Sequence, residues 1–307
     1  MKKLRKFFEI LKKAGHAFIE DNALKLSASL SYYMVFALGP IILMVITFAG
    51  SVFKKDLVQG KVYYELSKLL GSEAALQIQS IIANTQNSHN STVGTAIGLV
   101  ALFLGATGVF GEIQDSINYI WSVKAKPQRG WLRFIINRLL SFSIIISMGF
   151  ILLVALVINA IMELLSDRLM RLFSEGTIYI FYAVNLLLIF VIITVLFAAI
   201  YKILPDAKIK WRDSFIGASF TAVLFLAGKF LIGYYLGRSN IGVVYGTAAS
   251  IIFILLWVYY SSVILYFGAE FTRMYAIMSG GGILPDKTAV FIIKKEAREI
   301  PESHLDT

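Results

Sequence analysis

The chain has 307 residues, of which 58% are hydrophobic and only 16% are charged. Soluble domains carry about 25% charged residues, so this composition excludes an ordinary soluble protein and indicates an integral membrane protein. The net charge of +10 is therefore expected to orient helices in a membrane, with no role in binding nucleic acid. Because the chain has no cysteine, disulfides, thiolate metal sites and cysteine nucleophiles are excluded.

Residues 1–20 predict an amphipathic helix. Apolar residues recur at helical spacing from Leu4 to Ile19, and lysine and arginine occupy most of the other positions. Such a helix lies on the cytoplasmic leaflet, where anionic lipid attracts it. A helix that binds a partner protein is the alternative. The apolar residues are not continuous, so a cleaved signal peptide is not expected. Asp21 and Asn22 are expected to cap the helix that follows.

Six predominantly apolar segments are long enough to cross a bilayer, which takes about 20 residues. They are 29–53, 93–112, 138–162, 179–203, 214–236 and 246–270. The predicted fold is therefore all-α, with a six-helix transmembrane domain at 22–278 between the interfacial helix at 1–21 and a flexible cytoplasmic tail at 279–307. The long connection at 54–92 predicts short extracytoplasmic helices.

The basic residues are divided unevenly between the two sides of the predicted membrane domain. Alternate segments, counted from the N-terminal one, carry 21 of the 29 Lys and Arg residues, and the other three connections carry 7. Cytoplasmic segments hold the excess of positive charge, so both termini are predicted to be cytoplasmic.

Small and helix-breaking residues mark the first span. Gly39 and Pro40 are expected to kink it, because proline removes a backbone donor. Ser27 and Ser31 share one face of the same helix. Close packing of small residues and a hinge that lines a cavity both account for this pattern. The tetrapeptide ILPD occurs at 203–206 and 283–286, and its unmatched flanks favour chance over an internal repeat.

Polar residues near the second and fifth spans are candidate site residues, because polar groups are costly in hydrocarbon. Glu112, Asp115 and Asn118 lie at the end of the second span, and the two carboxylates share a face with Tyr119. A solvated helix end accounts for them unless the helix is buried. Lys229 lies about 10 Å inside the fifth span, at 1.5 Å per residue, where snorkelling and a buried role are both compatible with its position.

Glu270 ends the sixth span and is the leading candidate. Arg273 lies one turn further on the same face, and an ordinary i, i+3 ion pair between the two is the simpler explanation of this carboxylate. Gly268 and Ala269 leave room for another helix, and a helix C-terminus disfavours negative charge. We therefore expect a cationic partner outside the helix as well. The candidates are Lys208, Lys210 and Arg212 in the preceding cytoplasmic loop.

Four separated blocks carry a family resemblance. They are NALKLSASLSYYMVFALGP (22–40), INYIWSV (117–123), YKILPDAKIKWRDSFIGA (201–218) and VVYGTAASIIFILLWVYYSSVILYFGAE (243–270). With these blocks in this order, the chain resembles the YihY/virulence factor BrkB family, whose members were once labelled ribonuclease BN. The resemblance implies a six-helix bacterial inner-membrane protein with cytoplasmic ends, for which transport is the usual conjecture.

The nuclease label can be tested against the residues. The histidines are His16, His89 and His304, which fall in the N-terminal helix, the long connection and the tail. No HExxH or P-loop pattern occurs, so we expect no metal site, no cofactor and no enzymatic activity. The favoured hypothesis is a transporter of an unidentified small or amphiphilic solute. The alternative is a membrane-embedded structural or regulatory partner protein, and a ribonuclease is the least favoured.

Overall fold

The structure is a computed structural model that describes residues 2–35, 37, 60, 63, 108–126, 175–238 and 249–294. These residues are mostly helical, and residues 23–35 and 108–120 form two of the helices. The remaining elements are α1 (Lys2–Glu20), β1 (Val123–Ala125), α7 (Glu175–Ile203), β2 (Ala207–Lys208), α8 (Trp211–Arg238), α10 (Ala249–Met278), β3 (Leu284–Pro285) and β4 (Ala289–Phe291).

Two of the described helices contain a stretch long and apolar enough to cross a membrane. These stretches are Leu186–Ile203 in α7 and Ile254–Met278 in α10. The helix α8 covers the predicted fifth span. The third predicted span, most of the first two, the Gly39–Pro40 kink and nearly all of the connection at 54–92 lie outside the described residues. The count of six spans therefore stays a prediction.

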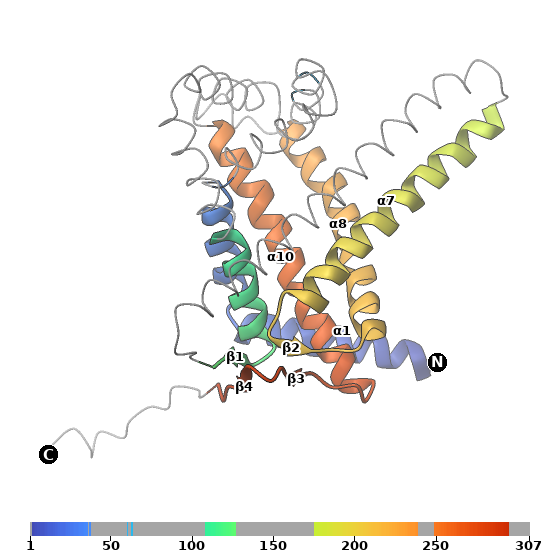
Figure 1. Ribbon diagram of the computed structural model, residues 1–307. Coiled ribbons are helices and arrows are strands. Elements are labelled where there is room, and N and C mark those ends of the chain that lie inside the picture. Colours follow the sequence, from blue (N-terminus) through green and yellow to red (C-terminus); the bar gives the residue numbers. More distant parts are fainter. Residues whose placement is uncertain are drawn as a thin grey trace, which may run out of the picture.

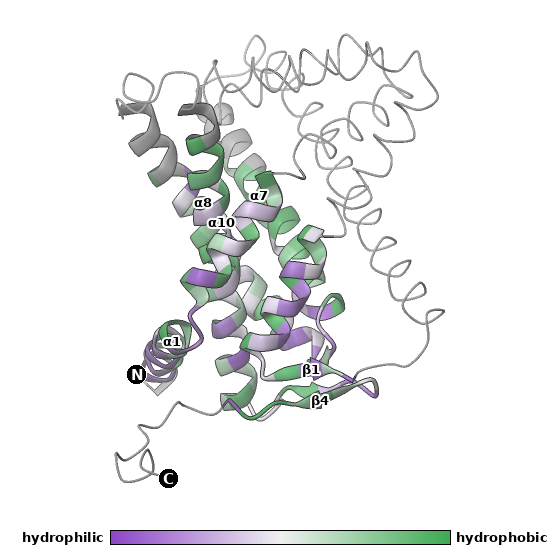
Figure 2. Ribbon diagram, turned by 90° about the vertical axis from the view of Figure 1, so that its left-hand side faces the viewer, coloured by the Kyte–Doolittle hydropathy of each residue, from purple (hydrophilic) through white to green (hydrophobic). Residues whose placement is uncertain are grey.

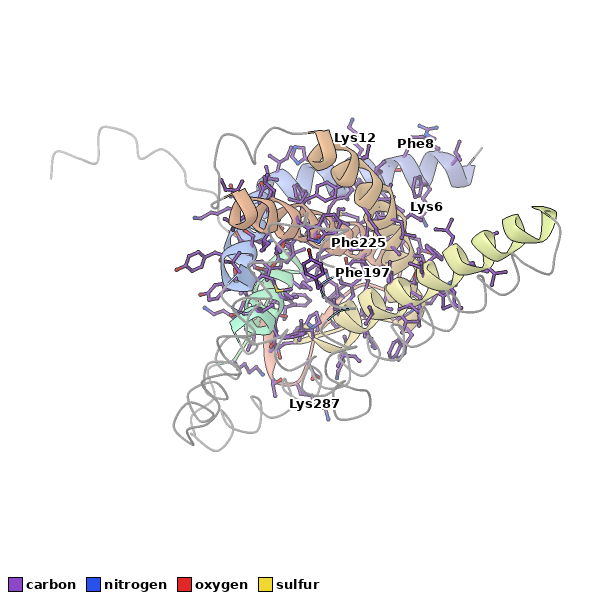
Figure 3. All side chains as sticks on the ribbon, turned by 90° about the horizontal axis from the view of Figure 1, so that it is seen from above. Lys6, Phe8, Lys12, Phe197, Phe225 and Lys287 are labelled. Carbon is purple, nitrogen blue, oxygen red and sulfur yellow. The ribbon has the colours of Figure 1, made fainter. Side chains whose placement is uncertain are left out.

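The helices α7, α8 and α10 run lengthwise, and α1 lies across their lower end (Figure 1). Hydrophilic residues gather toward that end and along α1, as the hydropathy colours show (Figure 2). Viewed from above, Phe197 of α7 and Phe225 of α8 lie between the two helices, with ring centroids 5.9 Å apart (Figure 3). Four segments carry most of the basic residues, namely 1–28, 113–138, 202–213 and 271–307. Their described parts meet at the lower end of the structure.

The segment after α10 folds back onto the molecule, which corrects the predicted flexible tail as far as residue 294. Strand β4 pairs antiparallel with β1, and β3 pairs antiparallel with β2. The two ILPD segments lie side by side, because the backbone N–H of Asp286 donates to the carbonyl of Asp206 at 2.9 Å. Strands of two or three residues leave no periodic signal, so the sequence predicts neither this pairing nor the departure from an all-α fold. We call residues 283–294 the strap.

The antiparallel helices α8 and α10 pack through the same five-residue pattern. GASFT spans 217–221 in α8, and GAEFT spans 268–272 in α10. A Cβ added to Gly217 would lie 1.8 Å from the Thr272 hydroxyl oxygen. A Cβ added to Gly268 would lie 2.0 Å from the hydroxyl oxygen of Thr221. Each glycine therefore makes room for the threonine of the other copy, the close approach that small residues permit between membrane helices.

The two phenylalanines of the pattern extend the contact between these helices. The rings of Phe220 and Phe271 stack with centroids 3.9 Å apart, and Phe7 of α1 lies against both. Offset aromatic stacking of this kind adds about 0.5–1.5 kcal/mol beyond the area it buries. The lower end of α10 is thereby held between α8 and α1.

Candidate functional site

Glu270 is completely buried in α10, with an exposed fraction of 0%. Neither of its carboxylate oxygens has a hydrogen-bond partner among the described residues. The nearest cation is Arg273, whose Nη1 lies 3.7 Å from Oε2. A buried charge is costly unless it is paired and hydrogen-bonded, so this carboxylate is an unusual group to retain.

The burial of Glu270 follows from the small residues before it. The indole Nε1 of Trp121 donates to the backbone carbonyl of Ala269 at 3.1 Å. Trp121 and Ala269 are both buried, at 2% and 0% exposed. The turn after the helix at 108–120 can approach α10 this closely because Ala269 has only a methyl group.

Asp21 and Lys294 complete the site with Glu270 and Arg273, and we call these four residues the charged cluster. Lys294 Nζ lies 2.5 Å from Asp21 Oδ2. Arg273 Nη1 lies 3.5 Å from the same Asp21 oxygen. One guanidinium nitrogen therefore serves the carboxylates of both Asp21 and Glu270. The cluster joins α1, α10 and the strap, and it contains two acids and two bases.

The turn after the helix at 108–120 contributes two neutral hydrogen-bond acceptors, both from Ser122. Ser122 has a positive φ of 57°, and its hydroxyl oxygen accepts from Arg273 Nη2 at 3.2 Å. The backbone carbonyl of Ser122 also accepts from the N–H of Ile292 in the strap at 2.9 Å. One turn thus positions both the guanidinium of Arg273 and the strap that carries Lys294.

The docking of α1 places Asp21. Ile10 and Ala14 are buried and pack with Phe271 of α10. Lys6 Nζ donates to the backbone carbonyl of Met278, at the end of α10, at 2.9 Å. After α1 the chain turns through Asn22 at a φ of 52°, which asparagine tolerates better than most residues. Asn22 lies at the start of the next helix as expected, but the Asp21 carboxylate points to the cluster instead of capping it.

Lys294 is the member of the cluster that the strap supplies. Its Nζ lies 4.4 Å from the centroid of the Tyr119 ring, in addition to its contact with Asp21. Burial lowers the pKa of Lys294, while the Asp21 carboxylate acts in the opposite direction. The ammonium therefore gains an aromatic and an acidic partner but loses part of its hydration.

Asn118 has a structural role in the described fold. Its side-chain amide donates to Asp206 Oδ2 at 2.8 Å, and its side-chain oxygen accepts from the backbone N–H of Asp206 at 2.9 Å. Asp115 lies at the surface nearby. Partial desolvation, followed by repulsion from Glu112 and Asp206, raises the pKa of Asp115. Asn118 and Asp115 lie on the side of the helix near Asp206, and within the described residues neither they nor Glu112 forms an ion pair with the charged cluster.

The loop cations that the sequence offered as partners of Glu270 lie elsewhere. Lys208 Nζ pairs with Asp286 at 3.1 Å. A backbone hydrogen bond from Lys287, followed by the contact with Lys208, lowers the pKa of Asp286. Lys210 and Arg212 are exposed, and neither forms an ion pair with Glu270. Of the four expected partners the structure pairs only Arg273 with Glu270, because β2 turns the loop toward the strap.

The structure also describes three other residues that the sequence singles out, which are Lys229, Ser27 and Ser31. Lys229 is exposed on α8, far from the cluster along the helix. Ser27 and Ser31 are buried, and their hydroxyls donate to the backbone carbonyls of Ala23 and Ala28, both at 2.8 Å. Both serine hydroxyls thus donate within their own helix, which is compatible with close packing of small residues in the first predicted span.

Three members of the site were missed by sequence reasoning. Asp21 was interpreted as a cap, Lys294 as part of a flexible tail, and Ser122 was not singled out. An acidic residue at the junction of an amphipathic helix and a span is a signal for Asp21. Within the described residues, no group of three His, Cys, Asp or Glu side chains is arranged to hold a metal ion.

The comparisons with known proteins agree with the blocks in the sequence. The profile of the family described as Virulence factor BrkB matches residues 14–289. A UPF0761 membrane protein of Ralstonia nicotianae is 27% identical over 88% of this chain and 58% of its own length. One of Pseudomonas paraeruginosa is 27% identical over 83% of this chain and 60% of its own length.

A shorter relative carries a different name. The ribonuclease-like protein YfkH of Bacillus subtilis is 25% identical over 81% of this chain and 88% of its own length. The chain thus spans only about three fifths of the UPF0761 relatives that it matches, but most of YfkH. No solved structure matches the chain.

Proposed function

Since the chain belongs to the Virulence factor BrkB family, we propose that it is a transporter or translocator of a small or amphiphilic solute. We place it in the bacterial inner membrane as a six-helix protein with cytoplasmic termini. The observation that carries the proposal is Glu270, a carboxylate with no exposed surface and no hydrogen-bond donor among the described residues, in a helix long and apolar enough to cross a membrane. Ionisable groups inside membrane helices commonly mark pathways for ions and solutes.

The proposed topology is supported by the lower end of the structure. The segments with the basic excess meet there, since β1 pairs with β4, β2 pairs with β3 and Asp21 contacts Lys294. Single cysteines test the orientation, because the chain has none. A cysteine at Ser88 should react from outside intact cells, and one at Ser303 only after permeabilisation. Equal labelling of both in intact cells contradicts the proposal.

Helix α1 is proposed to rest on the anionic cytoplasmic leaflet. Helix α1 is docked on the protein through the buried Ile10 and Ala14, while Leu4, Phe8 and Ile19 remain exposed. Phe8 and Lys12 project from α1 at the edge of the molecule (Figure 3). Each basic residue near anionic lipid contributes about 1 kcal/mol to binding. Replacing the five lysines of the isolated helix by glutamine should weaken binding to anionic vesicles, and binding indifferent to lipid charge contradicts the proposal.

Solute flux in reconstituted vesicles tests the transport proposal. Wild type is compared with Glu270→Gln, and Glu112→Gln serves as a carboxylate control outside the charged cluster. We expect flux of at least one solute in the wild type, loss of it in Glu270→Gln, and retention in the control. Absence of flux over a broad panel of charged and amphiphilic solutes contradicts transport.

The runner-up functions predict different results. A structural or regulatory protein would lose its activity on deletion of α1 or the strap and keep it in Glu270→Gln. The name of YfkH raises a ribonuclease as a third candidate. Purified protein that cleaves RNA in a metal-dependent reaction would support it, but the described residues offer no metal-binding group of three side chains.

A further inference from the structure

Within the charged cluster, Asp21 has closer contacts with the two cations than Glu270 has. Arg273 Nη1 faces both acids, at 3.5 Å from Asp21 and 3.7 Å from Glu270. Of the two acids, Lys294 forms an ion pair with Asp21 and none with Glu270 among the described residues. Glu270 therefore has the weaker share of the positive charge, and within the part of the chain that the structure describes neither of its oxygens accepts a hydrogen bond. A buried acceptor that is left unsatisfied destabilises the folded state, and it does so more strongly when it is charged.

Charge balance in the cluster depends on the strap. With Lys294 docked, Asp21 and Glu270 are balanced by two cations; without it, two carboxylates share one guanidinium. Among the described residues, the neighbouring turn adds the uncharged side chains of Trp121 and Ser122, and the Tyr119 ring lies against Lys294. Glu20 points away and pairs with His16 on the exposed side of α1. Two close carboxylates with too little positive charge cannot both stay ionised easily.

We propose that the Asp21–Glu270 pair is a proton-binding site whose occupancy alternates with the docking of Lys294. When the strap leaves, one proton from the cytoplasm binds a carboxylate oxygen of the pair. The resulting carboxyl group donates a hydrogen bond to the other carboxylate and supplies the donor that Glu270 lacks. When the strap returns, Lys294 restores the balance and the proton is released to water. No bond other than O–H forms or breaks.

Lys294 also couples strap release to proton uptake, in the same direction as the carboxylate pair. Burial lowers the pKa of Lys294, and undocking returns that pKa to its ordinary value. Undocking therefore takes up protons at Lys294 wherever the docked ammonium is partly deprotonated. Acidification favours strap release through both groups. This coupling between proton binding and strap release is a property of the folded protein and does not depend on transport. Within the proposed transport function, it would make the proton the coupling ion.

Strap position can be measured directly in the full-length protein. Spin labels on cysteines at Lys12 and Ile293, both exposed and outside the cluster, report the distance between α1 and the strap. In lipid nanodiscs we expect one short distance at alkaline pH and a growing longer population as the pH falls. Glu270→Gln should remove this transition or shift it by about 1 pH unit or more to lower pH. Glu20→Gln, the adjacent exposed acid, should leave it unchanged.

A second measurement covers the case in which Glu270→Gln misfolds. Infrared spectroscopy of the carboxyl stretch follows protonation in otherwise wild-type cysteine-free protein. With Lys294→Gln the pair should take up its proton about 1 pH unit or more above the wild-type midpoint, because one positive charge is gone. An unchanged or lower midpoint overturns the proposal, as does a strap that stays docked throughout acidification. Neither measurement requires a solute, so failure here is distinguishable from failure of transport.

Discussion

The two five-residue copies, GASFT in α8 and GAEFT in α10, make the same contact but differ in charge. Gly217 and Gly268 each accommodate the threonine of the other copy, and Ala218 and Ala269 are both fully buried. At the third position, however, Ser219 stands in α8 where Glu270 stands in α10.

The residue that follows each five-residue copy also differs in charge. Ala222 follows GASFT, and Arg273 follows GAEFT. The helix-packing residues are thus common to both copies, whereas both charged residues belong to one. Since packing alone is satisfied without charges in α8, the carboxylate and guanidinium in α10 are not needed to bring the helices together. This difference separates the structural part of the pattern from the candidate site.

The largest effect is expected when only one of the two charged residues of α10 is replaced by its counterpart in α8. Among the described residues, Arg273→Ala leaves Lys294 as the one cation beside the two buried carboxylates. Removing one member of a buried pair typically costs about 3–5 kcal/mol, so the free energy of unfolding should fall by about that amount. The double variant Glu270→Ser with Arg273→Ala, which copies α8 fully, should recover part of the loss. Unfolding in mild detergent measures both, and a double variant worse than the single one contradicts the cluster.

The next effect comes from the glycines. Gly268→Ala introduces a methyl group against Thr221 and Tyr201, whose oxygens lie 2.0 and 2.4 Å from the Cβ position. Overpacking of this kind costs about 1–3 kcal/mol, and we expect the upper end. Gly217→Ala meets only Thr272 and should cost less. Gly111→Ala, whose Cβ has nothing within 4 Å, should be neutral or stabilising. Equal stability of all three variants would contradict the reciprocal packing.

A smaller effect distinguishes the threonines. The Thr221 hydroxyl bonds the Gly217 carbonyl at 2.8 Å and lies 3.1 Å from the Tyr201 hydroxyl. The Thr272 hydroxyl bonds only the Gly268 carbonyl, at 2.6 Å. Thr221→Val should therefore cost about 1 kcal/mol of unfolding free energy, and Thr272→Val about half as much. Thermal unfolding ranks the two variants, and the reverse order would contradict this assignment.

The smallest effect tests whether charge is tolerated at the matching position of α8. Ser219 is partly exposed, and its hydroxyl bonds back to the Phe215 carbonyl at 2.8 Å. Ser219→Glu should change the unfolding free energy by no more than about 0.5 kcal/mol, as most surface substitutions do. A large destabilisation would show that the two copies have equally closed surroundings.

Several features followed from local sequence. Apolar length predicted helices at 179–203 and 246–270, and the structure has α7 at Glu175–Ile203 and α10 at Ala249–Met278. The end of α10 lies beyond the prediction because Phe271 and Ala276 continue to find buried partners in α1 and the core. The place of Glu270 in an apolar run marks it as an unusual residue, and the structure buries it completely, but its role stays a prediction.

The sequence by itself determined that this is a helical membrane protein of the BrkB family, because composition, apolar length and the order of four blocks are properties of neighbouring residues. Only the tertiary structure decided which charges meet. Asp21 and Lys294 lie 273 positions apart, and no local pattern links them. The strap depends on strands of two or three residues, too short for any periodicity. A charged cluster assembled from three separate elements exists only once α1 and the strap have docked, because each element supplies a charge that the others neutralise.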